Sequence, residues 1–379
     1  MIRLTNGKLI SSGKIIEGVD ILVENGIIAD VVPTAPDTNA INLNGNYIAP
    51  GFIELHCHGA MGYEFMDGTE EAYFKICEKH ATHGTRVMYA TFSAADFKVL
   101  YKALETFEKV KDQLPLEVPG VHLEGPYFAL EMSGAQNPEF IHEPRAEEYI
   151  PIIERFGHLI SRWSYAPELD EDNKFLDYLV AHNITPAIGH SAAEYSHVLS
   201  AFENGNRLVT HLYSCTSTIT RHGGFRHLGI IESAYLLDDM FVEAIADGCH
   251  LPPELLRLIV KQKGTDRVAL ITDATRAGGM TAEEFNGGSS GGMKFIIEDG
   301  VAKLPDRTAF VGSIATAERL LKRTVSAGIS LEDTVKMMTE TPANIMGLKT
   351  KGKLKKGYDA QFTVFDENLN IVNFEIQYS

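Results

Sequence analysis

The chain has 379 residues, of which 44% are hydrophobic and 22% are charged, a composition that excludes disordered, collagen-like and coiled-coil proteins. Its 34 Lys and Arg against 51 Asp and Glu give a formal net charge of −17 at pH 7. This charge argues against a nucleic-acid partner, because a phosphate backbone would be repelled, but it leaves a small anionic substrate open.

The first 50 residues contain short, mostly apolar runs separated by turn dipeptides. The turns are Asn6-Gly7, Asn25-Gly26 and Asn44-Gly45, and Asn-Gly between apolar runs is a strong hairpin signal. We therefore predict an antiparallel β-unit here. The start of the chain lacks a signal-peptide apolar run, and no stretch of about 18 apolar residues follows. We expect a cytoplasmic protein with no membrane partner.

Short apolar runs then alternate with amphipathic helical stretches up to about residue 275. The predicted strands are 51–59, 85–93, 118–127, 162–168, 185–191, 207–214, 241–250 and 267–274. The predicted helices between them are 70–84, 94–110, 175–183, 193–205 and 252–264. Eight strand–helix repeats predict an α/β fold, a (β/α)₈ TIM-like barrel. An open doubly wound sheet is the alternative, but no G-x-G-x-x-G follows the first strand.

The segment NGGSSGG at 286–292 interrupts this pattern after the eighth strand. Because a strand-like run follows it rather than a helix, we predict a β-hairpin insertion near 286–310 and no phosphate-binding loop. The chain ends in further strand and turn signals. We therefore predict a barrel over 51–346 and a small, discontinuous β-sandwich domain built from 1–50 and 347–379.

Metal-type side chains follow several predicted barrel strands. His56 and His58 close the first strand, where residues i and i+2 point to the same side. The others are Glu124, His190, His211 and Asp273, after the third, fifth, sixth and eighth strands. The carboxyl ends of barrel strands converge on one rim, where active sites are built. Each residue alone could be structural, but together they predict a divalent metal site, and imidazole with carboxylate favours Zn or Fe over Mg.

Three further histidines are expected to have no ligand role. His80 and His83 stand one helical turn apart at the end of the first predicted helix, where we expect solvated side chains. His122 shares the strand face of Glu124, so we expect it inside the barrel or behind the ligands.

Several longer motifs resemble the amidohydrolase superfamily and, within it, the N-acetylglucosamine-6-phosphate deacetylase family. They are PGFIELHCHG, GVHLEGPYF followed by SGAQNP, GHSAA, THLYS, ADGCH, ITDA and TPANIMGL, spread over nearly the whole chain. The resemblance implies that Glu124, His190 and His211 are the principal metal ligands. It implies that His56 and His58 hold a second ion in members that bind two, and that Asp273 is the catalytic acid/base.

The resemblance also implies a set of substrate-binding residues. It places the backbone of Ala135 near the acetyl group, Gln136 beside it in the same motif, and His250 on the sugar. Ser214 and Cys215 stand where the family usually has Asn-Ala, in the region that contacts substrate and phosphate. Arg226 matches an arginine that reaches the phosphate in a neighbouring subunit, which implies a homodimer.

These implications predict a deacetylase of N-acetylglucosamine-6-phosphate that uses one or two divalent ions. The departures near Cys215 and Arg226 leave open the galactosamine epimer, an unphosphorylated amino sugar, or another amidohydrolase such as a D-aminoacylase. A cyclic-amide hydrolase is disfavoured, because the fourth strand ends in SYAPE without the lysine that such enzymes modify. A catalytically inactive scaffold is disfavoured because all six donors are present.

Overall fold

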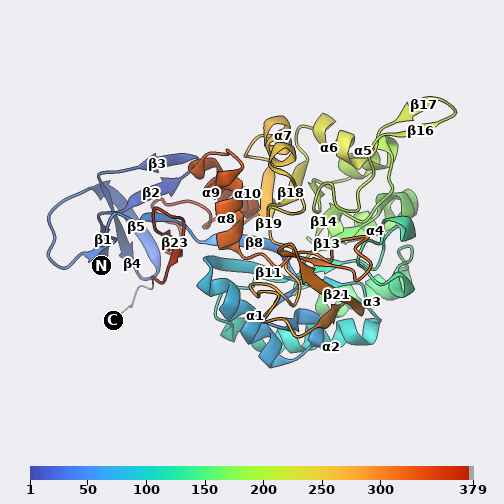
Figure 1. Ribbon diagram of the computed structural model, residues 1–379, viewed down its shortest axis with the longest axis horizontal. Coiled ribbons are helices and arrows are strands. Elements are labelled where there is room, and N and C mark those ends of the chain that lie inside the picture. The colour runs from blue at the N-terminus through green and yellow to red at the C-terminus, as the bar shows by residue number, and fades with distance from the viewer. Residues whose placement is uncertain (375–379) are drawn as a thin grey trace.

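The structure is a computed structural model and describes residues 1–374. The last five residues of the predicted C-terminal β-segment, 375–379, lie outside the described residues. A sheet of eight parallel strands forms the centre of the molecule (Figure 1). In chain order these are β8 (Phe52–Cys57), β11 (Thr85–Ser93), β12 (Val121–Glu124), β13 (Ile160–Tyr165), β14 (Thr185–Ile188), β15 (Leu208–Val209), β18 (Phe241–Ile245) and β19 (Val268–Ile271).

The eight strands curl into a barrel whose seam joins the first strand to the eighth. Neighbours follow chain order throughout, and the seam is closed by a parallel bridge between Cys57 and Ala274. The backbone N–H of Asp273 also donates to the carbonyl of His56 at 2.9 Å. The predicted (β/α)₈ barrel is therefore confirmed, and its seam lies at the predicted metal ligands.

Helices surround the barrel. The five predicted helices are present as α1 (Glu70–Thr82), α2 (Phe97–Val110), α4 (Lys174–Ala181), α5 (Tyr195–Glu203) and α7 (Pro253–Lys263). Thr69 and Asp96 accept backbone N–H groups at the starts of α1 and α2, as N-cap residues do. Five more were not predicted: α3 (Ala146–Phe156), α6 (Ile230–Leu236), α8 (Ala317–Ser326), α9 (Leu331–Met338) and α10 (Glu340–Ile345). None of the helices within residues 1–374 has the length and apolar character that crossing a membrane requires.

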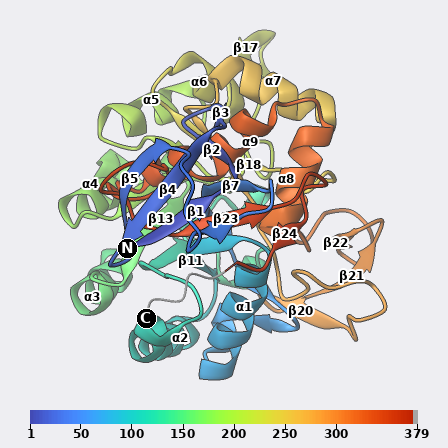
Figure 2. The same cartoon turned by 90° about the vertical axis from the view of Figure 1, so that its left-hand side faces the viewer.

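Strands from both ends of the chain form two small sheets beside the barrel (Figure 2). One contains β1 (Ile2–Thr5), β4 (Val19–Glu24), β5 (Ile27–Pro33) and β6 (Ile41–Asn42). The other contains β2 (Lys8–Ser11), β3 (Lys14–Ile16), β7 (Tyr47–Pro50), β23 (Phe362–Phe365) and β24 (Ile371–Val372). The C-terminal β23 pairs antiparallel with the N-terminal β7, and Leu4, Ile21, Ile48 and Val364 are buried in one cluster between the sheets. The predicted small β-sandwich from both chain ends is confirmed.

Only one of the three Asn-Gly dipeptides makes the predicted hairpin. Asn25-Gly26 joins β4 to β5, which pair antiparallel. The hairpin prediction is wrong at Asn6-Gly7 and Asn44-Gly45, where the chain passes from one sheet to the other. There β1 pairs with β6, and β2 with β7, in parallel, so the two turns lie together and Gly45 N–H donates to Asn6 O at 2.8 Å.

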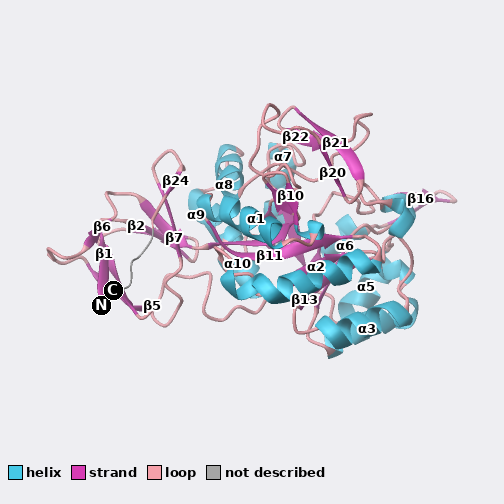
Figure 3. Ribbon diagram, turned by 90° about the horizontal axis from the view of Figure 1, so that it is seen from below, coloured by secondary structure: helices cyan, strands magenta, loops and turns pink. Residues whose placement is uncertain are grey.

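Two β-hairpin elements project from the barrel. The predicted insertion contains three short antiparallel strands, β20 (Gly288–Ser290), β21 (Met293–Glu298) and β22 (Val301–Lys303). The second element, β16 (Thr220–His222) with β17 (Phe225–His227), was not predicted. Figure 3 shows this β16–β17 hairpin at the end of the molecule opposite the small sheets of the chain ends.

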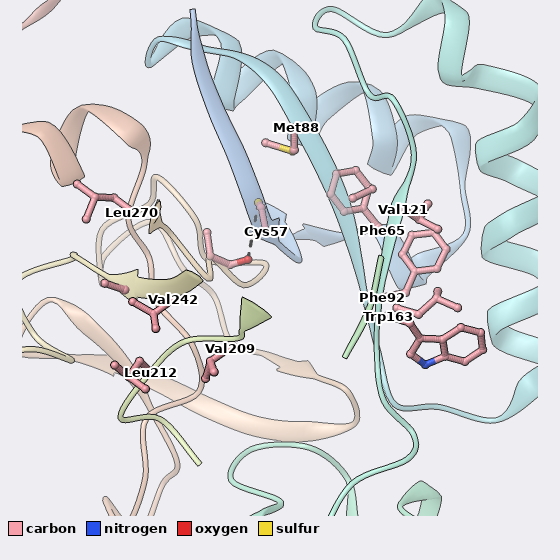
Figure 4. Packing of buried hydrophobic residues seen from close by; sticks show 14 of the residues in the cluster. Cys57, Phe65, Met88, Phe92, Val121, Trp163, Val209, Leu212, Val242 and Leu270 are labelled. Carbon is pink, nitrogen blue, oxygen red and sulfur yellow. Dashed lines mark hydrogen bonds between the residues drawn. The ribbon is translucent and has the colours of Figure 1, made fainter. Parts of the chain in front are cut away.

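The main hydrophobic core lies between the barrel strands and their helices (Figure 4). Phe92 and Trp163 on β11 and β13 are buried within it, as are Val209 and Val242 on the later strands. Because these side chains leave the strands toward the helices, the polar side chains that alternate with them face the barrel interior.

We expect Phe365→Ala to lower the free energy of unfolding by about 3–5 kcal/mol, a typical cost of truncating a buried Phe. Phe365 is fully buried, and its ring lies 5.4 Å from Tyr47 and 6.3 Å from Phe52, so it joins β23 to the N-terminal sheet and the barrel. Denaturation midpoints measure the effect. The control is Leu236→Ala, a large apolar side chain that is 59% exposed. Equal midpoints for the two variants would show that β23 adds no stability.

Candidate metal centre

Six side chains from the carboxyl ends of five barrel strands meet at one point, and all six are buried. They are His56 and His58 at the end of β8, Glu124 at the end of β12, and His190, His211 and Asp273 after β14, β15 and β19. The strand ends bring these predicted ligands together because neighbouring parallel strands end at the same rim.

Glu124 lies at the centre of this cluster. Its Oε1 is 2.9 Å from His211 Nε2, 3.1 Å from His190 Nε2 and 3.5 Å from His56 Nε2. Its other oxygen, Oε2, is 3.1 Å from His58 Nε2. One carboxylate thus faces all four imidazoles and links them into one cluster.

Asp273 completes the second half of the cluster. Its Oδ1 is 3.3 Å from His58 Nε2 and 3.4 Å from His56 Nε2, and these two nitrogens are 3.3 Å apart. Two groups of three residues therefore have ligand atoms that all lie within 4.8 Å of one another inside the group. The first is His56, His58 and Asp273, and the second is His56, Glu124 and His211. His190 touches the second set through Glu124.

Three of the six residues have an unusual backbone conformation. The φ angles of His190, His211 and Asp273 are 47°, 29° and 49°, in the left-handed region that non-glycine residues seldom adopt. Such conformations cost about 1–3 kcal/mol each and cluster at functional sites. Gly312 packs closely against the backbone of Asp273, since a Cβ atom at position 312 would lie 2.5 Å from the Asp273 carbonyl oxygen. The fold therefore holds these side chains at the rim at a cost in stability.

The electrostatics of the cluster favour positive charge. Burial lowers the pKa of His56 and His58, but Glu124 and Asp273 outweigh it and raise these values to about 9 and about 10. Burial raises the pKa of Glu124, but His56, His190 and His211 hold it well below its ordinary value. Two buried carboxylates thus face four imidazoles and require a cationic partner.

A divalent cation fits this donor set. Its charge would balance the two carboxylates with the imidazoles neutral, and a mixed nitrogen and oxygen set suits Zn or Fe. Two imidazoles also have partners on Nδ1, the nitrogen that faces away from Glu124. His190 Nδ1 lies 2.9 Å from the Met132 carbonyl oxygen, and His58 Nδ1 lies 3.3 Å from Ser93 Oγ. Such partners orient a histidine and leave Nε2 for a metal.

Gln136 lies against the cluster. Its Nε2 donates to Glu124 Oε2 at 2.7 Å, and its Oε1 accepts from the backbone N–H of Ala94 at 3.0 Å. The side chain is buried, yet the residue also lines the neighbouring cavity. The geometry therefore ties the predicted substrate-binding Gln136 to the orientation of Glu124.

A cavity of about 210 Å³ lies against five of the six residues, all but His56. Its other walls include the predicted substrate-binding residues Ala135, Ser214, Cys215 and His250. His250 is held by Asp247, whose Oδ2 is 3.0 Å from its Nδ1, so its Nε2 remains available to a ligand. The described lining contains no Lys or Arg, and Arg226 lies instead on the exposed strand β17.

Three residues that sequence reasoning missed belong to this site. Phe310, from the loop after the insertion, lines the cavity with its ring 4.9 Å from that of His250. Arg162 and Glu243 are fully buried charged residues within barrel strands. A charge inside a predicted barrel strand was the available signal for the last two, whereas nothing in the sequence around Phe310 marked it.

The structure corrects one of the expectations for the histidines outside the ligand set. The expectation of a solvated His80 is wrong: it is fully buried, and its Nε2 lies 3.2 Å from both Cys57 Sγ and Gly59 O. The last turn of α1 packs against the segment that contains the ligands, which explains the burial. His122 lies inside the barrel as expected, 2.7 Å from Ser164 Oγ. His83 is partly exposed and pairs with Glu318.

Comparison with known proteins gives concordant matches over nearly the whole chain. Residues 47–378 match the Amidohydrolase family. An N-acetylglucosamine-6-phosphate deacetylase of Lysinibacillus sphaericus is 29% identical over 360 residues, which cover 93% of this chain and 90% of that protein. The crystal structure of the Pasteurella multocida deacetylase matches with a TM-score of 0.90 at 26% identity, covering 98% and 96% of the two chains.

A second solved structure matches equally well. It is a mutant N-acetyl-D-glucosamine-6-phosphate deacetylase of Mycobacterium smegmatis in complex with N-acetyl-D-glucosamine-6-phosphate. Its TM-score is 0.90 at 25% identity, and the match covers 98% of this chain and 96% of that one.

Proposed function

The chain belongs to the amidohydrolase family, and from this premise we propose that it is a metal-dependent deacetylase of N-acetylglucosamine-6-phosphate, releasing acetate and glucosamine-6-phosphate. The observation that carries the proposal is the position of Asp273. Its carboxylate lies within 3.4 Å of two imidazoles of the cluster and also lines the cavity, so it can reach both a metal site and a bound substrate. The similarity to deacetylases over nearly the full length supports the substrate class.

The chemistry assigned to Asp273 is proton transfer. Burial raises the pKa of Asp273, but His56 and His58 outweigh it and hold it below its ordinary value, so the side chain is a carboxylate at neutral pH. A bound divalent ion would supply a water of lowered pKa and polarise the amide carbonyl. Asp273 accepts the water proton as the new C–O bond forms and delivers it to the nitrogen as the C–N bond breaks. Acetate and a free amine result, with no other reactant.

The cavity walls would bind the sugar. His250, held by Asp247, offers Nε2 to a hydroxyl group, and Phe310 offers an apolar surface to the C–H face of a pyranose ring. The backbone of Ala135 would lie near the acetyl group. We assign Ser214 and Cys215 to contact with the substrate, since both line the cavity.

The phosphate would be bound by Arg226 from a second copy of the chain. Arg226 lies on the exposed β16–β17 hairpin, and the described cavity lining contains no Lys or Arg of its own. A homodimer in which each hairpin reaches its neighbour's cavity would supply the missing charge.

We expect Arg226→Ala to raise KM for the sugar phosphate roughly tenfold or more, with little change in kcat. This is the loss of one charge-assisted contact of at least about 1.4 kcal/mol. Arg221→Ala on the paired strand is the matched control, and equal KM values for the two variants would remove Arg226 from the site.

The same cavity lining also favours a second candidate, an unphosphorylated N-acetylamino sugar, because no Lys or Arg within residues 1–374 lines the cavity. The two are separated by measuring kcat/KM for acetate release from N-acetylglucosamine-6-phosphate, its galactosamine and mannosamine counterparts, and the three free sugars. We expect N-acetylglucosamine-6-phosphate to be preferred. Preference for a free sugar would refute the phosphate assignment and the role of Arg226, and preference for another phosphorylated epimer would change the substrate only.

A further inference from the structure

We propose that Arg162 and Glu243 are a positioning pair that orients the imidazole of His56 and thereby assembles the ligand group of His56, His58 and Asp273. The inference rests on the metal centre of the proposed function. Neither residue lines the cavity, so neither is a candidate for contact with substrate.

The pair lies inside the barrel, directly behind the cluster. Arg162 comes from β13 and Glu243 from β18, and both side chains are fully buried. The Arg162 guanidinium donates to Glu243 Oε1, and also at 3.2 Å to each of the Leu55 carbonyl and Thr210 Oγ1. These contacts fix the carboxylate of Glu243 from one side.

The second oxygen of Glu243 faces the ligands. Oε2 lies 3.5 Å from His56 Nδ1 and accepts the backbone N–H of His211 at 3.4 Å. One carboxylate oxygen therefore contacts two members of the cluster, the side chain of one and the backbone of the other.

A neutral imidazole has one N–H and one lone pair, and the partner of one nitrogen decides which of the two carries the proton. With Nδ1–H directed at Glu243, Nε2 of His56 presents its lone pair to the space shared with His58 and Asp273. Without the carboxylate, the tautomer with hydrogen on Nε2 would be equally available, and its N–H would point at the cation. Glu243 thus favours the tautomer that can bind metal.

His56 is distinguished from the other three imidazoles by this carboxylate. The Nδ1 atoms of His58 and His190 face a hydroxyl group and a backbone carbonyl, and that of His211 has no partner within residues 1–374. The arrangement is also a poor source of stability. Desolvation offsets the attraction of a buried ion pair, and Arg162 Nε finds no partner among the described residues. A role in orienting His56 explains why this buried ion pair is present, whereas a role in stabilising the fold does not.

The test compares metal binding by the wild-type protein and Glu243→Gln, with Glu154→Gln, an exposed position, as the control. Apo protein is titrated with Zn²⁺ against a chromophoric chelator, and thermal melting verifies folding. We expect Glu243→Gln to bind one zinc ion about 10–100-fold more weakly, the usual effect of removing such a partner, and the control to match the wild type. With Co²⁺ in place of zinc, the visible absorption spectrum of Glu243→Gln should differ from that of the wild type, and the spectrum of the control should not. A purely structural role would not produce this difference.

If Glu243→Gln does not fold, the Arg162→Met/Glu243→Leu variant replaces the pair with apolar side chains and should show the same weakened site. Unchanged zinc affinity in a folded variant overturns the proposal, whatever the activity. Failure of the proposed function is a separate result: a wild-type protein that binds zinc but releases no acetate refutes the deacetylase and leaves this comparison valid. A wild-type protein that binds no zinc overturns both.

Discussion

An Asp273→Asn protein is expected to lose about 10²–10⁴-fold in kcat while it still binds a divalent ion. The amide has nearly the same shape as the carboxylate but cannot accept the proton of the attacking water or return it to the amine. The group of Glu124, His190 and His211 is untouched by the change, so the cation keeps these three ligands.

The measurement is kcat for acetate release together with metal content per chain. Asp112→Asn, at an 85% exposed side chain, is the control for the same chemical change and should leave both values unaltered. If the Asp273→Asn protein were as active as the wild type with its metal present, the assigned proton transfer would be wrong.

A Glu124→Gln protein is expected to lose both metal and activity. Glu124 is within 3.5 Å of all four imidazoles, so its replacement removes the one carboxylate that links the two halves of the cluster. We expect less than one tightly bound ion per chain and a loss of about 10²–10³-fold or more in kcat/KM, typical of removing a main electrostatic element of an active site.

Metal content and kcat/KM measured on the same preparation test this result. Glu131→Gln, at an exposed position outside the described cavity lining, controls for the loss of one acidic group. Full metal content in Glu124→Gln would remove Glu124 from the ligand set.

Much of the barrel could be predicted because its signal is local and repeated. Each of the eight strands is a short apolar run, and the five predicted helices show a clear periodicity and turn signals. Helix α3 carries Pro151 in its interior, which obscures its start and end. At the Asn-Gly turns, by contrast, the local signal did not determine how the strands pair. The same dipeptide makes a hairpin at Asn25-Gly26 and a passage between sheets at Asn6-Gly7, because the pairing of β1 with β6 is set by contacts distant in sequence.

The candidate ligands could be predicted for a physical reason, since a strand end in a barrel of this type specifies a place in space. No such rule locates the residues behind them. Arg162 and Glu243 become neighbours only when β13 and β18, which are three positions apart in the sheet, curve around a closed barrel, and the sequence separates the two residues by 81 positions. His80 was misjudged in the same way: a helix end is usually solvated, but the end of α1 packs against Cys57 and Gly59.

We propose that the cluster around Glu124 is a divalent metal centre on which deacetylation depends. Its most direct test is acetate release from N-acetylglucosamine-6-phosphate before and after metal removal by a chelator, with metal content measured throughout. We predict that activity disappears with the bound metal and returns when Zn²⁺ or Fe²⁺ is restored. Undiminished acetate release by a protein shown to contain no metal would contradict the account.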